Sequence, residues 1–260
     1  RSDTEFTQMI KRTENTGEVS AGIDMDKFAY EVGYSNFFRN YTDIEYTNLE
    51  YNENDGKFTA FYQLFPKTKL LAEYKYGKID YVSQEANDRD GDYHQGMIGL
   101  KGDLTGKTVG VVKAGYQSRT YKGTSREDFK KPVAEVGLIT DFTEKTRLET
   151  KFSRMAYEST YGNNNYYDSY RLQAKLTQKL WSSWSLYGLL QYENNKYPET
   201  DSSIDKRRKD DIYTGNVGLQ YDIKDWLKAK FNYEFKEDSS NVDTSEYKRH
   251  LTSLSLTLLM

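Results

Sequence analysis

The chain has 260 residues and a net charge of −3; 30% of its residues are charged and none is cysteine. The lack of cysteine excludes disulfides and thiolate metal sites, and the net charge gives no general case for nucleic-acid binding. No apolar run reaches about 18 residues, which excludes a transmembrane helix.

The mean hydropathy of −0.91 would suit a soluble or disordered chain, but 24 Tyr and 12 Phe are too many for a disordered one. A polar average with abundant tyrosine is typical of a membrane β-barrel, in which the lumen and the loops face water and aromatic residues ring both interfaces. Residues Arg1–Glu5 lack the apolar stretch of a signal peptide, so we interpret the N-terminus as mature or trimmed.

Apolar residues recur at every second position in many short segments of the chain. In residues 27–38, for example, Phe28, Tyr30 and Val32 alternate with polar or small residues. A pleated strand sends alternate residues to opposite faces, so this period of two predicts strands with one apolar and one polar face. Strands of about ten residues with a tilt of roughly 45° can span the hydrocarbon layer. In chain order, the predicted strands lie near residues 27–38, 55–65, 69–82, 93–103, 107–119, 132–142, 145–158, 168–179, 184–194, 211–222, 226–237 and 246–259. Residues 3–12 and 17–24 could supply two more, so we expect 12 or 14 strands and prefer 14.

The connections between these segments alternate between short and long. Short turns are predicted at residues 66–68, 104–106, 143–144, 181–183 and 223–225, and long polar connections near 83–92, 120–131, 159–167, 195–211 and 238–245. Tight periplasmic turns on one rim and long extracellular loops on the other are typical of bacterial outer-membrane barrels. We therefore predict an all-β fold, a transmembrane antiparallel up-and-down β-barrel that forms a single domain over residues 1–260 in the bacterial outer membrane.

A soluble β-sandwich or lipocalin-like barrel would show the same alternation. Such folds bury their apolar face as a core of Val, Ile, Leu and Phe. Here many positions of the apolar face are Tyr, Gly, Ala or Thr, which suit contact with lipid and pack poorly as a core. A soluble barrel with this number of strands would also be unusually wide for a filled interior.

Several stretches resemble a known family. Residues 27–38, Leu64–Thr68 and Leu71–Tyr76 resemble the bacterial outer-membrane β-barrel porins that are often found beside exopolysaccharide and capsule export systems. The units Gly99–Thr108 and Gly137–Thr146 repeat that family's order of apolar strand, Thr, Lys-Thr and apolar strand. The resemblance covers nearly the whole chain and implies a porin or conduit of a Gram-negative outer membrane, associated with polysaccharide export and without catalytic residues. The chain departs from the family in being shorter and in ending on Met260 rather than on an aromatic residue.

Side chains that could support catalysis are sparse. His94 and His250 lie far apart in the sequence near strand ends, and we interpret both as solvated surface residues. No serine stands in a nucleophile-elbow motif, and carboxylate pairs can be drawn anywhere among 40 acidic residues. An outer-membrane hydrolase is therefore a weak alternative, and we expect no enzyme, no cofactor and no metal site.

The polar face of the predicted strands carries many charged residues. If the apolar face contacts lipid, these side chains point into the lumen, where they could line a conduit and tune which solutes pass. The alternative is that they form cross-strand ion pairs that only hydrate the inner wall, and both interpretations can hold together. Basic residues outnumber acidic ones among them, which predicts a weak preference for anions if the lumen is open. The predicted lumen-lining residues are Glu73, Lys75, Lys101, Lys113, Glu135, Arg147, Glu149, Lys151, Arg171, Lys175, Lys228, Lys230 and Glu234.

The predicted connection at 195–211 contains a basic run, residues 205–211. We interpret it as a solvated loop; the alternative is that it binds phosphates of lipopolysaccharide or an anionic glycan, because Arg pairs with phosphate in bidentate fashion. The expected partners are the lipid bilayer and lipopolysaccharide, with a glycan substrate or a periplasmic export partner as further candidates, and no nucleic acid.

Two functions stay open on this basis. One is an outer-membrane porin or conduit that passes polar solutes or an exopolysaccharide through a charged lumen. The other is a structural barrel whose lumen holds a partner protein, such as a cytochrome or a secretion subunit. An open pore predicts ion conductance, whereas an occupied scaffold predicts almost none until its partner is removed.

Overall fold

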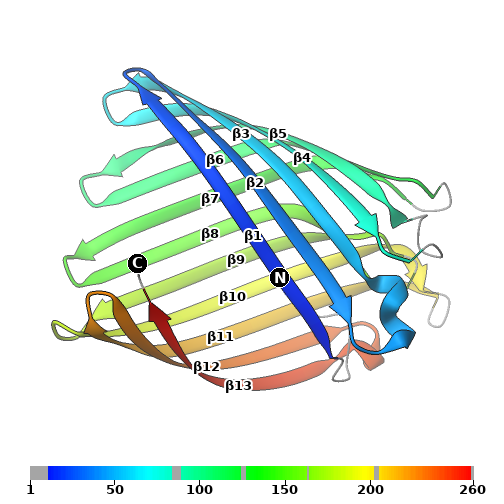
Figure 1. Cartoon of the computed structure of the whole chain (residues 1–260). Coiled ribbons are helices and arrows are strands. Elements are labelled where there is room, and N and C mark those ends of the chain that lie inside the picture. Colours follow the sequence, from blue (N-terminus) through cyan, green and yellow to red (C-terminus); the bar gives the residue numbers. More distant parts are fainter. Residues whose placement is uncertain (1–10, 84–88, 124–126, 163, 202–204, 259–260) are drawn as a thin grey trace.

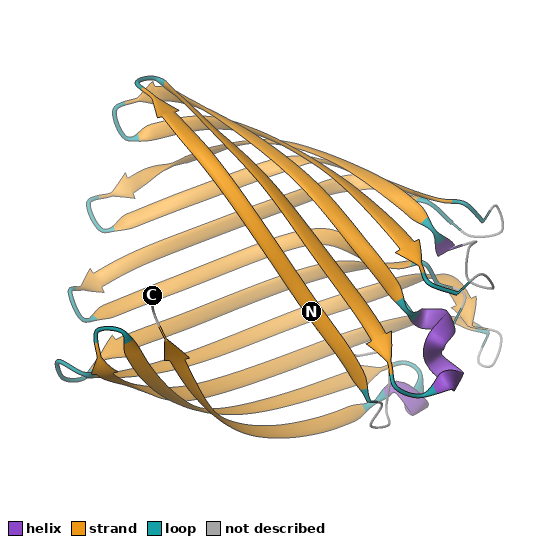
Figure 2. Cartoon of the chain, in the orientation of Figure 1, coloured by secondary structure: helices purple, strands orange, loops and turns teal. Residues whose placement is uncertain are grey.

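The computed structural model describes residues 11–83, 89–123, 127–162, 164–201 and 205–258. The thirteen strands of these residues form one antiparallel sheet, in which each strand pairs with the next one along the chain (Figure 1). Two short 3-10 helices, η1 (Ile44–Leu49) and η3 (Asp243–Ser245), lie at the rim that carries the longer connections (Figure 2). The strands are β1 (Arg12–Met25), β2 (Phe28–Tyr41), β3 (Tyr51–Phe65), β4 (Thr68–Tyr81), β5 (Gly91–Thr105), β6 (Thr108–Tyr121), β7 (Phe129–Thr143), β8 (Thr146–Glu158), β9 (Tyr166–Lys179), β10 (Trp184–Asp201), β11 (Lys206–Lys224), β12 (Leu227–Ser240) and β13 (Tyr247–Leu258).

The sheet twists and curves around an interior. In Figure 1, β1 and β2 pass in front of β7 to β11. The hydroxyl of Tyr81 on β4 donates a hydrogen bond to Glu158 Oε1 on β8 at 2.7 Å, although three strands separate β4 from β8 in the sheet. A flat sheet would hold these two strands about 19 Å apart, at about 4.8 Å per step. The sheet is therefore strongly curved, and the contact crosses the interior on its concave side.

The thirteen strands of the described residues do not confirm the expected 12 or 14. The twelve strands predicted from residue 27 onward are all present, and residues 17–24 lie within β1. The strand predicted for residues 3–12 falls almost entirely on residues 1–10, outside the described residues. No ladder joins β1 to β13 within the part of the chain that the structure describes, so closure of the sheet is not observed there.

Alternate connections are short and lie on one rim, as predicted. The turns expected at 66–68, 104–106, 143–144, 181–183 and 223–225 coincide with observed turns to within a residue or two. The long connection expected at 195–211 is wrong, because β10 continues to Asp201 and β11 begins at Lys206, so that most of this segment is paired strand. Its residues are polar on both faces, so an apolar period of two could not mark it as a strand.

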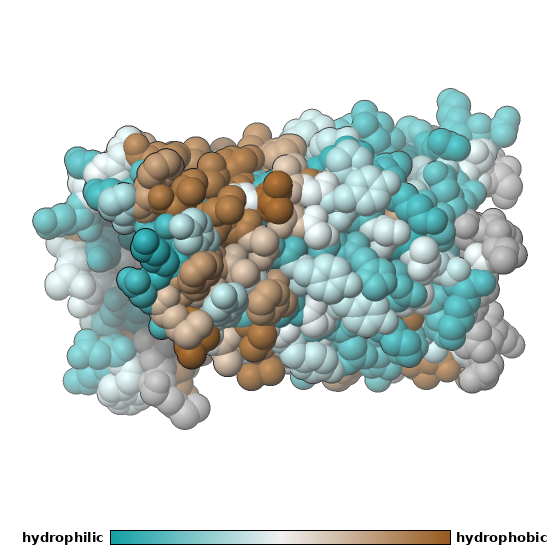
Figure 3. Space-filling model, turned by 90° about the horizontal axis from the view of Figure 1, so that it is seen from above, coloured by the Kyte–Doolittle hydropathy of each residue, from teal (hydrophilic) through white to brown (hydrophobic). Residues whose placement is uncertain are grey.

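The outer face of the sheet carries an apolar band next to the short turns. Figure 3 shows apolar side chains gathered over that half of the visible surface and hydrophilic ones over the half next to the long connections. Leu254, Leu172 and Phe231, which belong to the apolar faces of their strands, are 76%, 54% and 50% exposed. Apolar side chains exposed over so much of a surface suit contact with lipid rather than with water.

A row of tyrosines, the tyrosine girdle, ends the apolar band on its long-loop side. On five of the seven strands the next outward-facing position beyond it is polar; for example, Asn36 follows Tyr34 and Ser118 follows Tyr116. Tyrosine at the boundary between hydrocarbon and water is a typical interfacial anchor. The strands therefore extend past the apolar band into a part that is polar on both faces. The girdle comprises Tyr34, Tyr74, Tyr116, Tyr170, Tyr192, Tyr213 and Tyr233.

Candidate functional site: the polar interior

The predicted lumen-lining residues share one face of the sheet. Lys113 on β6 lies opposite Glu135 on β7, Glu135 lies opposite Ser153, and Ser153 lies opposite Arg171. Residues that lie opposite one another project from the same face, and the period of two extends that face along each strand. Arg119, six residues after Lys113 on β6, projects from the same face and contacts Glu158 on β8 at 3.2 Å, so this face is the concave side of the sheet and lines its interior.

Four of the predicted residues form one ion-pair network midway along the strands. The Lys113 ammonium lies 3.2 Å from Glu73 on β4 and 3.2 Å from Glu135, and Lys151 on β8 lies 3.2 Å from Glu135. Lys113 reaches across β5 because Gly99 has no side chain; a Cβ there would lie 2.9 Å from Lys113 Cγ. The side chains of Lys113 and Glu135 are only 12% and 16% exposed. Charges so far removed from water need partners of this kind, and two cations here balance two carboxylates.

The other predicted residues make separate contacts along the strands. Lys101 and Lys230 lie over the rings of Phe61 at 5.9 Å and Tyr187 at 5.0 Å, and neither has a carboxylate within 4.0 Å among the described residues. The remaining seven pair with residues on neighbouring strands: Lys75 with Asp55 (2.9 Å), Glu149 with Lys175 (3.3 Å), Arg147 with Asp141 (2.7 Å), Arg171 with Glu193 (3.0 Å), Lys228 with Asp222 (4.0 Å) and Glu234 with Arg249 (2.7 Å). Cross-strand ion pairs thus neutralise most of this face.

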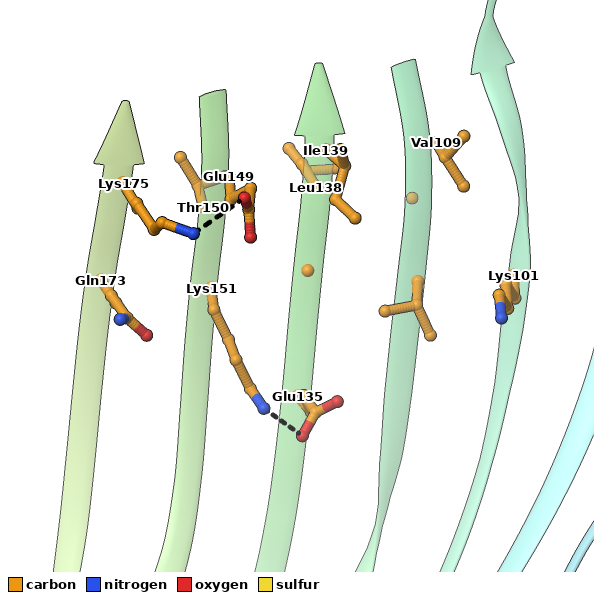
Figure 4. A pocket seen from close by; sticks show the side chains of 13 residues that line it. Lys101, Val109, Glu135, Leu138, Ile139, Glu149, Thr150, Lys151, Gln173 and Lys175 are labelled. Atoms are coloured by element: carbon orange, nitrogen blue, oxygen red, sulfur yellow. Dashed lines mark hydrogen bonds and ion pairs between the residues drawn. The ribbon is translucent and has the colours of Figure 1, made fainter. Parts of the chain in front are cut away.

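The interior is hollow next to the short turns. A cavity of about 320 Å³ opens along β5 to β9, and Figure 4 shows its lining side chains. The ion pairs Glu149–Lys175 and Glu135–Lys151, drawn as dashed lines, stand on one side of it, and Lys101 stands on the other. The lining therefore offers charged groups of both signs, beside apolar side chains such as Ile139 and Val109.

Next to the long loops, side chains fill the interior instead. Arg119 lies over the Tyr93 ring at 4.4 Å, and the Tyr93 hydroxyl donates a hydrogen bond to Asp55. Glu158 accepts the hydrogen bond from Tyr81 and pairs with Arg119, and the side chains of Arg119 and Glu158 are 5% and 1% exposed. We call these five residues, Asp55, Tyr81, Tyr93, Arg119 and Glu158, the loop-end layer. They come from β3, β4, β5, β6 and β8, so the layer bridges a wide arc of the sheet.

A second group of buried charges lies at the same end, on β9 to β11. Arg208 pairs with Asp210 at 2.9 Å, and both side chains are 0% exposed. The Arg208 guanidinium lies 4.2 Å from the centre of the Tyr161 ring, and Glu193, also 0% exposed, pairs with Arg171. The interior is thus packed with paired charges and tyrosines at the long-loop rim and hollow at the short-turn rim.

The sequence prediction did not include the charged residues of the loop-end layer. Arg119 is six residues after Lys113 on the same strand, so extending the alternation past the apolar band would have identified it as an inward-facing residue. Glu158 is the last residue of its strand, where the sequence assigns no face. Arg208 was assigned to a loop, and the structure places it within β11.

No helix in the described part of the chain is long and apolar enough to cross a membrane. Those residues contain no group of three or more His, Asp or Glu side chains that could hold a metal ion. His94 and His250 are exposed on the outer face, where each hydrogen-bonds a girdle tyrosine, Tyr74 at 2.6 Å and Tyr233 at 2.7 Å.

Solved structures with a similar fold are outer-membrane channels and receptors. The monoaromatic hydrocarbon channel CymD is 12% identical, with a TM-score of 0.50 over 96% of this chain and 86% of that one. The iron transporter FrpB of Neisseria meningitidis is 10% identical (TM-score 0.56, 88% of this chain and 45% of that one). The alcaligin receptor FauA of Bordetella pertussis is 11% identical (TM-score 0.56, 95% and 50%). The chain spans half or less of the length of FrpB and FauA, and at these identities the likeness concerns the fold.

No curated protein sequence matches the chain. A family profile does match it, over residues 2–259, and the family's description is "Putative beta-barrel porin 2". Together with the barrel-forming neighbours, this match supports a place in the outer membrane and a general role as a transport conduit, and it suggests a transporter rather than an enzyme. Because the match extends over nearly the whole chain, the protein belongs to this β-barrel porin family.

Proposed function

We propose that the protein is a passive outer-membrane conduit for polar solutes, which pass along its charged inner face. The observation that carries this proposal is the distribution of charge on the sheet. Ionised side chains extend along the inward face from the cavity near Lys101 to the loop-end layer, while the outward face of the same strands is apolar from the short turns to the tyrosine girdle. A polar lining lowers the cost of moving a hydrated solute through a hydrocarbon layer.

The polar lining argues for hydrophilic rather than hydrocarbon cargo in this chain. The CymD channel is described as carrying monoaromatic hydrocarbons, but ion pairs such as Lys113–Glu73 would offer such a molecule no favourable contact. We further propose a weak preference for anions, because Lys101 and Lys230 lack a carboxylate partner in the described residues whereas most other inward charges are paired. An anionic glycan is one such solute, and the resemblance to porins found beside polysaccharide export systems supports it.

The loop-end layer sets the limit on passage in this proposal. Its side chains lie across the interior where a solute would have to leave the cavity, so small solutes pass beside the layer and large ones only when it opens. The layer also favours the second candidate, a scaffold barrel that stays closed until a partner protein enters or leaves. The two candidate functions differ in whether the purified protein alone lets solutes cross a membrane.

Liposome swelling tests the proposal. Vesicles that contain the purified protein should swell in isotonic solutions of small sugars, and the rate should fall as the sugar becomes larger. Arg119→Ala, which removes the cation between Tyr93 and Glu158, should raise the rate for larger sugars. The matched control is Arg154→Ala, because Arg154 also pairs with a carboxylate, Asp168 at 2.9 Å, but lies on the outward face. No swelling with either protein would contradict the conduit and favour the scaffold.

A further inference from the structure

A pocket rich in cations lies beyond the tyrosine girdle, away from the cavity and the loop-end layer. It has a volume of about 400 Å³ and lies along β7, β9, β10 and β11. Five cations contribute to its lining, namely Lys131, Lys196, Arg207, Arg208 and Lys209, against the two acids Glu127 and Asp168. Nothing in the conduit proposal uses this pocket.

Two of the acids in and around the pocket, Asp168 and Asp210, are already engaged by arginines. Asp168 receives two hydrogen bonds from Arg154, at 2.9 Å and 3.3 Å, and Arg208 is neutralised by the buried Asp210. Lys196 and Arg207 are exposed and have no carboxylate within 4.0 Å in the described part of the chain. The pocket therefore carries a net positive charge that the protein itself does not compensate.

Two of these cations face each other directly. Lys196 on β10 lies opposite Lys209 on β11 in the register of the sheet. Like charges at opposed positions destabilise a sheet, and an anion bound between them would offset the repulsion. Lys209 has only a long contact to Asp211, at 3.5 Å, and Lys196 lies over the Tyr170 ring at 5.2 Å.

Asn241, after β12, holds the β11 part of the pocket in place. Its Oδ1 accepts a hydrogen bond from the Lys209 backbone N–H at 2.8 Å, and its Nδ2 donates to the Arg207 carbonyl at 2.9 Å. Both cations are thus presented from a fixed strand rather than from a loose loop, which lowers the entropy lost when a ligand binds.

The position of the pocket indicates what occupies it. Lys196 and Lys209 face outward four residues beyond the girdle residues Tyr192 and Tyr213 of their own strands, with the polar residues Asn194 and Asp211 between them. Girdle tyrosines mark the boundary of the hydrocarbon, so this level is that of the lipid headgroups. Lys and Arg bind phosphate through charge-assisted hydrogen bonds.

We propose that this pocket is a binding site for a phosphate group of a phosphorylated glycolipid in the outer leaflet, with Lys196, Arg207 and Lys209 as its ligands. The site fixes a lipid against β10 and β11. It requires that the barrel lies in the membrane with the girdle at the interface, but it does not depend on whether the interior conducts.

The test measures binding of diphosphoryl lipid A to the purified full chain in detergent micelles by native mass spectrometry, beside a neutral glycolipid and inorganic pyrophosphate. The double variant Lys196→Gln and Lys209→Gln should weaken lipid A binding about tenfold or more, or by about 1.4 kcal/mol, because it removes two charge-assisted hydrogen bonds to the phosphate. The matched control is Lys248→Gln: Lys248 is 66% exposed, faces outward near the same rim and is paired with Glu237, so its loss should change affinity less than about twofold.

A second readout separates a lipid site from a merely structural role. Lys209→Gln removes the opposed like charges, so it should raise the stability of the lipid-free protein while lowering its affinity for lipid A. Arg207→Gln, which leaves the Lys196–Lys209 pair intact, should also weaken binding, and it serves if the double variant does not fold. Unchanged affinity in these variants, or equal binding of the neutral glycolipid, would overturn the proposal. Pyrophosphate binding as tight as that of lipid A would assign the site to free phosphate compounds instead.

Discussion

The clearest test of which face meets lipid is an arginine placed at the middle of the apolar band. Val217 is 49% exposed on the outer face of β11, four residues from the girdle residue Tyr213 and four from Tyr221, which stacks on Trp184 near the short-turn rim. With a rise of about 3.3 Å per residue and a tilt near 40°, four residues place Val217 about 10 Å from either boundary. Val217 therefore lies close to the mid-plane of the membrane.

Val217→Arg should cost about 2–4 kcal/mol, the usual cost of an arginine on the lipid face at that depth. The matched control is Asn216→Arg, because Asn216 is the adjacent residue, faces inward and lies opposite Glu234, which can pair with the new cation. The control should cost well under 1 kcal/mol, since a lumen position is hydrated. A difference of about 2 kcal/mol is a shift of about 30-fold in the unfolding equilibrium. Denaturant unfolding of the protein folded into lipid vesicles measures both, and equal costs would refute the assignment of faces.

Three further outcomes follow from the interior. Lys113→Met should destabilise the protein by about 1–3 kcal/mol in denaturant unfolding, because it leaves two largely buried carboxylates without their shared cation; a neutral effect would show that the network is hydrated. Gly77→Leu should lower the thermal midpoint and, in bilayers, raise conductance, because a Cβ at Gly77 would lie 2.3 Å from the Tyr93 ring and displace it from the loop-end layer; unchanged values would place Tyr93 elsewhere. Arg171→Glu combined with Lys230→Glu should move the reversal potential in a salt gradient toward cations, and no shift would mean that these side chains lie outside the conducting path.

The sequence predicts the strands well wherever one face is apolar. In β11, Tyr213, Val217 and Tyr221 alternate with polar residues, and the structure places this series on the outer face as expected. Alternation of apolar residues no longer marks a strand beyond the girdle, where both faces of a strand are polar. Residues 195–211 lack the alternation for that reason and were predicted as a loop, although most of them continue the paired strands β10 and β11.

The sequence predicts which residues share the inward face, but it does not predict which of them contact one another. The alternation along each strand is enough to place Lys113 and Glu135 on the inward side. It cannot show that Lys113 also reaches Glu73 across Gly99. Contacts that cross the interior, such as Tyr81 with Glu158, depend on the curvature of the sheet, which no local pattern encodes. The packed loop-end layer therefore emerges only from the structure.

Conductance of the purified protein in planar lipid bilayers tests the central claim most directly, because it asks whether the polar interior joins the two sides of a membrane. We predict discrete conductance steps at low salt with a weak preference for anions, which fades toward 1 M salt as the Debye length falls to about 3 Å. Arg119→Ala should enlarge the steps, and the outward-facing control Arg154→Ala should leave them unchanged. A protein that inserts and resists denaturant, yet shows no steps with or without Arg119, would contradict the conduit.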